Sequence, residues 1–356
     1  MQTPSDFIEQ VRAAAAADQP LRIRGGGTKD FYGGPLQGRV LETRQWQGVE
    51  AHEPSELYLT ARSGTPLAQI EALLAAHRQI LAFEPPHFGA SATLGGCVAA
   101  GLSGPRRFAS GPASGNLRDH VLGAQLLDGR GRVLRFGGTV IKNVAGYDVS
   151  RLLAGSLGVL GLLLEVTLKV LPAPEAEYTL RFECGEAESL ALLCQWRGRP
   201  LPISASLWQQ GTLSLRLSGA GAAVRHAHSL LGGEALPDEE GAALWRDLRE
   251  HRLPLFAAAK TLWRIGVPDT AAPLELAGSQ AIEGGGLRWL ASDLPAAVIS
   301  GRAQALGGHA TRFRGGDREG APFAGLSAPQ LAIHRRLKQE FDPARIFNRG
   351  RMHPDL

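Results

Sequence analysis

Apolar and polar residues are arranged along the first half of the chain in a way that predicts both strands and helices. Short apolar runs predict strands at residues 21–24, 40–42, 58–61, 120–127, 132–136 and 159–171. Helical spacing predicts a helix that begins at Thr3-Pro4, one from about Pro66 to His77, and one near residues 148–153. The turn Asp128-Gly129-Arg130-Gly131 joins two of the strands and predicts a β-hairpin.

The pattern changes after Pro172 and Pro174, which end the last of these strands and indicate a domain boundary. Further along, strands are predicted at residues 178–183, 213–217, 262–267 and 287–290, and helices at 186–196, 222–231 and 328–341. This succession predicts an α+β layer with an antiparallel sheet and helices on one face. We therefore expect a first domain over residues 1–172, a second over 173–325, and a C-terminal helix and tail over 326–356 that return to the first.

Composition excludes several classes of protein. The chain has 356 residues, 45 of them glycine, and a net charge of +4 from 38 basic and 34 acidic side chains. It is too aperiodic for collagen and too apolar for a disordered chain, and it has no dense basic stretch of the kind that binds nucleic acid. The three cysteines, Cys97, Cys184 and Cys194, are too few for a disulfide framework or for an iron–sulfur cluster built from this chain alone.

The sequence also bears on the location of the protein. We expect no signal peptide, because the first residues include an early acidic side chain and no apolar core segment. The longest apolar stretch, residues 159–171, is interrupted by Gly161, Glu165 and Lys169, so it is too short and too charged to span a bilayer. We expect a cytoplasmic protein, with peripheral attachment to the inner membrane through a complex as the alternative.

The glycine run Arg24-Gly25-Gly26-Gly27-Thr28-Lys29 is the first candidate site, and it follows a predicted strand. Glycines allow positive φ, and successive backbone N–H groups in such a turn form a concavity that suits phosphate oxygens. The run fits neither the P-loop nor the G-x-G-x-x-G fingerprint that opens a helix. A tight surface turn with no ligand is the alternative.

The second candidate is the segment from Ala92 to Gly104, where small residues fill nearly every position. It contributes little side-chain volume to a core. One interpretation is a helix packed closely against a sheet. The other is that its amides and hydroxyls line an extended dinucleotide, whose pyrophosphate needs close backbone approach.

Two further motifs follow in order: residues 114–123, Ser-Gly-Asn-Leu-Arg-Asp-His-Val-Leu-Gly, and residues 142–170, which contain Gly-Tyr-Asp and Gly-Ser-Leu-Gly-Val-Leu-Gly. Together with the two earlier segments they resemble the vanillyl-alcohol oxidase / p-cresol methylhydroxylase (PCMH) flavoproteins. The likeness covers residues 1–172 and returns in the Phe-Asp-Pro-x-x-Ile-Phe-Asn stretch near the end. It implies an α+β fold, with a PCMH-type FAD-binding domain of two subdomains and a smaller α+β substrate or cap domain with an antiparallel sheet.

Within this family the sequence most resembles the smaller FAD-binding subunits of bacterial glycolate oxidases, in residues 101–107, 142–148, 262–265 and 288–290 and in its short C-terminal end. The likeness implies a flavoprotein that acts on a small 2-hydroxy acid, oxidising glycolate to glyoxylate, in a complex with a catalytic flavin subunit and an iron–sulfur subunit. The catalytic subunits carry a His-x-Gly-Asp-Gly-Asn-x-His motif that this chain lacks. The chain is therefore expected to be accessory or electron-relaying.

The resemblance also implies FAD-contacting residues. In the early loop and the small-residue segment these are Arg24, Gly25, Gly26, Gly27, Thr28, Lys29, Thr93, Leu94, Gly95, Gly96, Gly101, Ser103 and Gly104. Those implied by the later motifs are Gly115, Asp119, Gly158, Gly161, Leu163 and Asn348, the last followed by Arg349 where the family has proline. Covalent attachment in the family uses a histidine or cysteine; the early loop has neither, and Cys97 is expected to be a buried apolar residue. We expect noncovalent FAD and no metal site.

Oxidation of a 2-hydroxy acid also needs a cation for the carboxylate and a base for the hydroxyl. Arg264 is the candidate cation, because strand alternation places Trp263 and Ile265 on one face and Arg264 on the other. A solvent-facing arginine is the alternative. No convincing base is found: His226 and His228 do not share a helix face, and His309 and His334 are isolated.

Two alternative functions remain open from the sequence. A stand-alone FAD-dependent 2-hydroxy acid dehydrogenase would need a base that the sequence does not reveal. A non-catalytic scaffold subunit would hold partner subunits without FAD.

Overall fold

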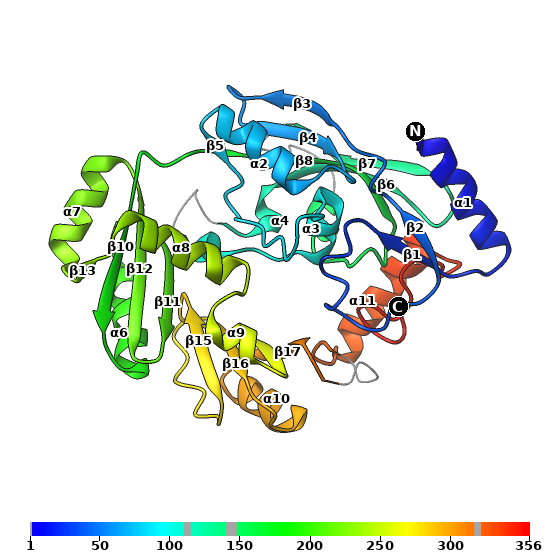
Figure 1. The fold of residues 1–356 in the computed structure, drawn as a ribbon. Helices are drawn as coiled ribbons and strands as arrows, with labels where there is room; N and C mark the ends of the chain where they lie inside the picture. The colour runs from blue at the N-terminus through cyan, green and yellow to red at the C-terminus, as the bar shows by residue number, and fades with distance from the viewer. Residues whose placement is uncertain (1, 110–114, 140–147, 317–321) are drawn as a thin grey trace. The chain divides into compact units, whose positions relative to one another are not determined.

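The structure is a computed structural model that describes residues 2–109, 115–139, 148–316 and 322–356 (Figure 1). Its contacts divide the chain into two compact units, the first made of Met1–Leu102, Leu117–Pro172 and Arg318–Leu356, and the second of Ser103–Asn116 and Ala173–Asp317. The expected first domain ran unbroken over residues 1–172, whereas residues 103–116 group with the second unit. The Lys142–Tyr147 part of the family motif lies outside the described residues.

The first unit is built on a five-stranded antiparallel sheet with strand order β3-β4-β8-β6-β7. Its strands are β3 (Val49–Glu53), β4 (Tyr58–Arg62), β6 (Val121–Leu127), β7 (Val133–Gly137) and β8 (Leu162–Lys169). Two small sheets accompany it: parallel β1 (Leu21–Arg24) and β2 (Arg39–Glu42), and antiparallel β5 (Gln79–Ile80) and β9 (Leu171–Pro172). Its helices are α1 (Pro4–Ala16), α2 (Leu67–Ala76), α3 (Leu94–Ala100), α4 (Leu117–His120), α5 (Val149–Leu152) and α11 (Ala328–Phe341).

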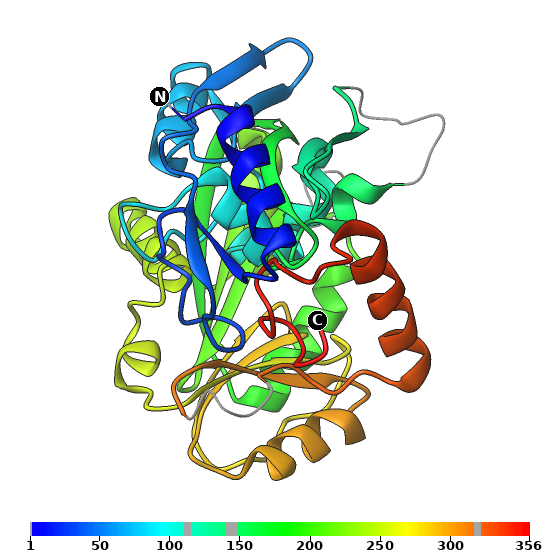
Figure 2. The same ribbon diagram turned by 90° about the vertical axis from the view of Figure 1, so that its right-hand side faces the viewer.

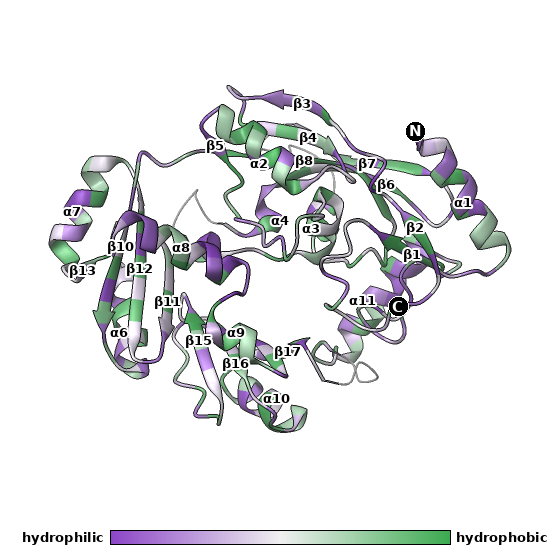
Figure 3. Ribbon diagram, viewed as in Figure 1, coloured by the Kyte–Doolittle hydropathy of each residue, from purple (hydrophilic) through white to green (hydrophobic). Residues whose placement is uncertain are grey.

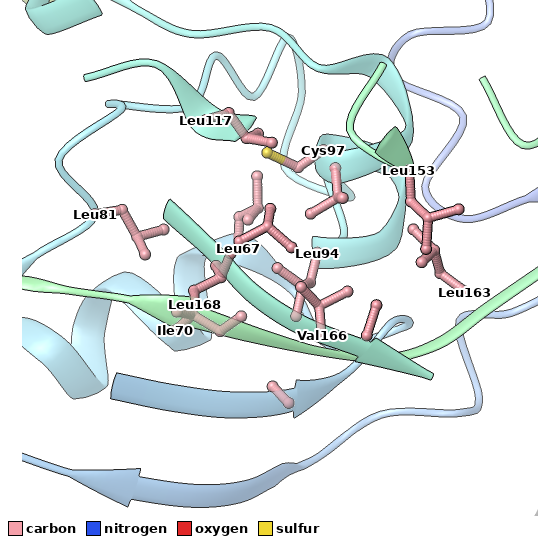
Figure 4. Packing of buried hydrophobic residues seen from close by; sticks show 14 of the residues in the cluster. Leu67, Ile70, Leu81, Leu94, Cys97, Leu117, Leu153, Leu163, Val166 and Leu168 are labelled. Atoms are coloured by element: carbon pink, nitrogen blue, oxygen red, sulfur yellow. The ribbon is translucent and has the colours of Figure 1, made fainter. Parts of the chain in front are cut away.

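The central strands of this sheet are apolar because both of their faces are covered. Residues of β6 and β8 are almost all buried, whereas the edge strand β3 is hydrophilic (Figure 3). Helices α2 and α3 place Leu67, Leu94 and Cys97 against Val166 of β8 in one hydrophobic cluster (Figure 4). A second cluster joins the N-terminal helix α1 to the C-terminal segment around Phe347 (Figure 2). The two ends of the chain therefore complete the first unit.

The predicted hairpin at residues 128–131 is confirmed, since β6 and β7 pair antiparallel on either side of it. The buried carboxylate of Asp128 accepts hydrogen bonds from the backbone N–H groups of Arg130 (2.9 Å) and Arg132 (2.8 Å), and from Nε of Arg132 (2.8 Å). An aspartate that bonds the backbone two residues ahead is a common way of closing a turn.

A buried ion pair holds the C-terminal tail in place. Lys338 of α11 donates its three Nζ protons to Asp342 Oδ2 (2.8 Å), the carbonyl of Val159 (2.7 Å) and the carbonyl of Phe347 (3.0 Å). Asp342 also accepts the backbone N–H groups of Ile346 (3.1 Å) and Phe347 (2.8 Å). Because every donor of the ammonium group is satisfied, burial of both charges is tolerated and the tail is fixed beside the start of β8.

The second unit is built on an eight-stranded antiparallel sheet with order β13-β10-β12-β11-β15-β16-β14-β17. The strands are β10 (Ala176–Glu183), β11 (Ile203–Gln209), β12 (Thr212–Gly219), β13 (Glu234–Ala235), β14 (Leu262–Gly266), β15 (Ser279–Glu283), β16 (Leu287–Ala291) and β17 (His309–Arg314). The helices are the 3₁₀ helix η1 (Pro105–Phe108), α6 (Glu186–Arg197), α7 (Gly221–Leu231), α8 (Asp238–Arg249), α9 (Pro254–Ala258) and α10 (Ala296–Ala305). The predicted α+β class and antiparallel sheet are confirmed.

The expectation that the helices cover only one face of this sheet is wrong. Leu180 of β10 packs in a cluster with Leu193 of α6 and Val224 of α7. The neighbouring Thr179 points to the other face, where its hydroxyl accepts a hydrogen bond from Nε1 of Trp245 in α8 (2.8 Å). Neither α8 nor α9, which packs Phe256 against Trp289, was predicted from the sequence, so the second helical layer was missed.

Candidate functional site

The triple glycine follows β1 directly, and two of its glycines are needed for close packing rather than for flexibility. A Cβ on Gly26 would lie 1.6 Å from the carbonyl oxygen of Ser91, and a Cβ on Gly25 would lie 2.3 Å from Oγ1 of Thr93. Gly27 has φ of +70°, a conformation that L side chains rarely adopt. Ser91 also donates its hydroxyl to the carbonyl of Gly26 (2.9 Å). The loop is thus seated on the segment that leads into α3.

This loop forms one wall of a pocket that lies wholly within the first unit. Thirteen of the residues predicted to contact FAD line it: Arg24, Gly25, Gly26, Gly27, Thr28, Lys29, Thr93, Gly95, Gly96, Gly158, Gly161, Leu163 and Asn348. Segments that lie more than 300 residues apart in the sequence therefore meet at one place. The cavity holds about 100 Å³, which matches a diphosphate group better than a whole dinucleotide.

The polar groups of the pocket are open to a ligand. Among the residues that the structure describes, none accepts a hydrogen bond from the backbone N–H groups of Gly25, Gly26, Gly27 or Thr28. Two buried side-chain atoms of the lining, Nε of Arg22 and Oγ of Ser63, likewise have no partner there. Buried polar groups are normally hydrogen-bonded, so this cluster of unmatched donors indicates an anionic or strongly polar ligand.

Basic side chains of the lining strengthen the preference of the pocket for an anionic ligand. Arg22 and Arg24 lie on the same side of β1, two residues apart, and both line the pocket together with Lys29. Arg24 is partly offset by Asp30, which accepts from its Nε at 3.2 Å. Lys29 donates Nζ to the carbonyl of His87 (3.3 Å) and lies 5.6 Å from the centre of the Phe88 ring. The pocket keeps a positive excess of the kind that phosphate oxygens require.

The start of α3 contributes space rather than donors. Gly95 donates its N–H to the carbonyl of Ser63 (2.7 Å), and Gly96 donates its N–H to Oγ1 of Thr93 (3.3 Å). Leu94 is fully buried in the core cluster and does not line the pocket. The interpretation of this segment as a helix packed against the sheet is confirmed. One face of the helix also reaches the pocket, and contact of its amides and hydroxyls with a dinucleotide stays a prediction.

Asn348 ties the far wall of the pocket together. Its Oδ1 accepts the backbone N–H of Ile23 (2.8 Å), and its Nδ2 donates to the carbonyl of Leu157 (2.6 Å). Gly158 has φ of +71°, and a Cβ there would lie 2.7 Å from Nδ2 of Asn348. Arg351, which also lines the pocket, donates to the carbonyls of Tyr32 and Gly34. The tail that the Lys338–Asp342 pair fixes thus supplies part of the pocket.

Several residues predicted to contact FAD do not line this pocket. Gly101 ends α3 with φ of +65°, and Asp119 is exposed on α4. Ser103, Gly104 and Gly115 belong to the second unit. Their contacts to FAD stay predictions.

Cys97 also lies outside the pocket lining. Its side chain is buried in the core cluster of the first unit, among Leu94 and Leu117 (Figure 4). Burial raises the pKa of the Cys97 thiol to about 12, so this sulfur is protonated at neutral pH. The prediction that it is a buried apolar residue is confirmed.

Arg264 lies in the second unit, on β14. The predicted alternation is confirmed, because Trp263 and Ile265 pack in a cluster with α10. Arg264 pairs across the sheet with Trp289 of β16 and Thr311 of β17, and so shares the opposite face with them. Among the ranges described, no hydrogen bond or ion pair joins Arg264 to a protein group.

Sequence reasoning missed two residues of the first-unit pocket. Arg22 was signalled by the Leu-Arg-Ile-Arg alternation of β1, which places Arg22 and Arg24 on one side. Ser63 had no such signal, because it follows β4 and its position at the pocket depends on tertiary contacts, its carbonyl accepting the N–H of Gly95 and its own N–H donating to the carbonyl of Leu164. Within the part of the chain described, no group of three or more His, Cys, Asp or Glu side chains could hold a metal ion.

The pocket fits part of a bound dinucleotide, since unmatched amides, a buried guanidinium nitrogen, a buried hydroxyl and close-packed glycines suit a pyrophosphate. The chain matches a family model described as an FAD binding domain over residues 1–137. Two solved structures share the fold: an alkyldihydroxyacetonephosphate synthase (TM-score 0.68, 16% identity, covering 97% of this chain and 75% of that one) and a xylooligosaccharide oxidase from Myceliophthora thermophila (TM-score 0.68, 16% identity, covering 100% and 91%). These findings define an FAD-binding flavoprotein with a PCMH-type fold.

Similar proteins of known identity show to which family of FAD-binding flavoproteins the chain belongs. Glycolate oxidase subunit GlcE of Escherichia coli is 47% identical over 351 residues, which cover 98% of this chain and 97% of the relative. The chain belongs to the family of glycolate oxidase GlcE subunits. Subunit GlcD of Bacillus subtilis is 32% identical over 165 residues, 45% of this chain and 34% of that protein. A D-lactate dehydrogenase of Archaeoglobus fulgidus is 34% identical over 157 residues, 43% and 33% of the two chains. Every described helix is too short or too polar to span a bilayer.

Proposed function

We propose that the chain is the FAD-carrying subunit of a glycolate oxidase complex, which oxidises glycolate to glyoxylate. The observation that carries the proposal is the 47% identity to the GlcE subunit along nearly the whole length of both proteins. The partial matches to GlcD and to a D-lactate dehydrogenase support the same substrate class, the small 2-hydroxy acids.

The first-unit pocket would hold the pyrophosphate of FAD. The amides of Gly25 to Thr28 would donate to its oxygens, and Arg22 and Arg24 would balance its charge. Ser63 would donate its hydroxyl. When bound, FAD supplies the acceptor for the two electrons that leave the substrate carbon.

We propose that FAD is bound noncovalently. The pocket lining in the described part of the chain includes no histidine, cysteine or tyrosine. Cys97 follows the pocket-lining Gly96 in α3, but its thiol is protonated and packed in the core.

Oxidation of glycolate removes the hydroxyl proton and a hydride equivalent from the same carbon. Arg264 is proposed to hold a substrate carboxylate, because it is a guanidinium without a protein partner among the described residues. The chain lacks the histidine-rich motif of the longer flavin subunits. We therefore propose an accessory or electron-relaying role, with a longer flavin subunit removing the hydroxyl proton.

The partners proposed for the chain follow from this role. They are the catalytic flavin subunit and an iron–sulfur subunit, since three cysteines cannot supply a four-thiolate cluster from this chain alone. The complex is proposed to lie at the cytoplasmic side of the inner membrane through its other subunits.

Rapid mixing without oxygen tests the proposal. The FAD-loaded chain alone, and the complex assembled with and without it, are each mixed with glycolate while flavin absorbance is followed. We expect slow bleaching of the isolated chain and fast turnover only in the full complex. Fast bleaching of the isolated chain would refute the accessory role, and full turnover in the complex that lacks it would refute the subunit function.

A further inference from the structure

The second unit contains a pocket that is separate from the one proposed for the pyrophosphate. It is lined by the end of β14, by the starts of β16 and β17, by η1 and by the loop that follows β14. It encloses about 440 Å³. The side chains that give it chemical character are Arg107, Arg264, His309 and Asp269.

The charges of this pocket do not cancel. Asp269 is its one acidic lining residue in the described ranges, and Arg197 of α6 forms an ion pair with it. Arg197 also donates Nη2 to the carbonyl of Gly284 (2.6 Å), which fixes the loop and the turn together. Arg264 is then left without a counter-charge among the described residues, and Arg107 adds a second cation to the lining. The pocket therefore has an excess of positive charge that a bound anion would balance.

Arg264 is held in place for such an anion. Its cross-strand neighbours Trp289 and Thr311 are both about 4% exposed, so they support the base of the side chain on the sheet face. The guanidinium is left without a protein acceptor among the described residues. An arginine fork with both sides available matches the two oxygens of a carboxylate.

His309 lies next to Arg264 on the same face, because His309 pairs with Gly266 and Thr311 pairs with Arg264. Gly266 leaves room between them: a Cβ at that position would lie 3.1 Å from Cε1 of His309. Burial and the Arg264 charge lower the pKa of His309, so its ring is neutral at pH 7 and can donate or accept a hydrogen bond. The sequence had suggested an isolated histidine.

The second cation of the lining, Arg107, comes from η1. The ring of Phe108 packs on the turn at Gly284, where a Cβ would lie 2.2 Å from the ring. The Arg107 guanidinium lies 5.3 Å from the centre of that ring. Packing of Phe108 on the turn thus directs the adjacent Arg107 to the pocket.

We infer that this pocket binds a small 2-hydroxy or 2-oxo monocarboxylate, with Arg264 gripping the carboxylate, Arg107 as second cation and His309 contacting the 2-oxygen. A hydroxyl donates to the neutral ring and an oxo group accepts from it, so both classes of acid are accommodated. The choice of this class rests on the proposed function; the anion site itself rests on the charges and geometry of the second unit.

Titration of the full-length protein with glyoxylate tests the site. Arg264→Gln is expected to raise the Kd for glyoxylate about tenfold or more, and Arg107→Gln about threefold, because a charged hydrogen bond is removed in the first and a longer-range charge in the second. The matched control is Arg252→Gln, an exposed arginine of the same unit, which should leave the Kd unchanged. Retained near-ultraviolet circular dichroism shows that each variant is folded.

The possible results distinguish a failure of this binding site from a failure of the proposed function. Equal Kd values for wild type and both pocket variants, or no binding to wild type in the millimolar range, would overturn the site. Sulfate or acetate binding as tightly as glyoxylate would overturn the assignment to 2-hydroxy and 2-oxo acids. Glyoxylate binding that requires Arg264 in a protein unable to take up FAD would support the site while refuting the proposed function.

Discussion

The pocket of the first unit presents mainly backbone to its ligand, whereas the pocket of the second unit presents charged side chains. In the first, glycines allow two chain segments to touch, and the amides of Gly25 to Thr28 have no acceptor within the described ranges. In the second, a sheet face carries Arg264 and His309 side by side. A backbone site depends on the exact path of the chain, so changes in packing should harm it more than changes in charge. A side-chain site should show the reverse.

The largest effect should come from the buried pair that fixes the C-terminal tail. Lys338→Met leaves Asp342 buried without its ammonium partner, and we expect the first unit to lose about 3–5 kcal/mol of unfolding free energy. FAD affinity should fall as well, since the tail supplies Asn348 to the pocket. Urea denaturation of the full chain, with bound flavin and tryptophan fluorescence as probes, measures both. Arg336→Met on the same helix is the control, and an equal loss in the two variants would contradict the account.

A smaller effect should follow from a change in the glycine loop alone. Gly26→Ala places a methyl group against the Ser91 carbonyl, and relief of that overlap should cost about 1–3 kcal/mol of FAD binding. The Kd for FAD is measured by flavin fluorescence quenching. Gly138→Ala, where a Cβ would meet nothing within 4 Å, is the control. Unchanged FAD affinity in Gly26→Ala would show that the loop does not shape the site.

Charge should matter less in this pocket than packing does. Arg22→Gln removes a cation whose Nε is buried without a protein partner, and we expect FAD affinity to fall about tenfold, by roughly 1.4 kcal/mol. Arg39→Gln, an exposed arginine on the neighbouring strand, should leave it unchanged. If Arg22→Gln weakened FAD binding more than Gly26→Ala does, charge would matter more than packing in the first-unit pocket, contrary to the account.

The second unit should show a pH dependence that the first does not share. His251 stacks on Phe256 at 4.1 Å, and burial, with Arg314 and Arg264 nearby, lowers its pKa from 6.5 to about 3. The unfolded chain binds this proton between pH 6.5 and 3 while the folded chain does not, so stability falls as pH falls through that range. His251→Phe should flatten the thermal unfolding profile between pH 6.5 and 4. A profile as steep as that of wild type would show that His251 is not the group responsible.

The sequence predicted much of the fold because several signals are local. The bounds of α11 and β1 follow from periodicity and capping, and the hairpin at Asp128 follows from its turn residues. The layer containing α8 was missed because its role depends on a distant partner, Thr179 on the far side of the sheet. Local pattern does not reveal which face a helix will cover.

The residues of the candidate sites also fall into those that a local signal predicts and those that depend on distant partners. The glycine loop was found because close backbone approach demands glycine itself, which the sequence displays. Ser63 was missed because only tertiary pairing with Gly95 brings its hydroxyl to the pocket. The pairing of β14 with β17 brings His309 beside Arg264, although 45 positions separate them in the sequence, and no short motif encodes that neighbourhood.

The most direct test of the account is the flavin content of the purified full chain after incubation with FAD and removal of the excess. The account predicts a flavin absorbance spectrum with about one FAD per chain, all of it released into solution by acid precipitation of the protein. A chain that retains no flavin would contradict the assignment of the first-unit pocket. Flavin that stays with the precipitated protein would contradict noncovalent binding.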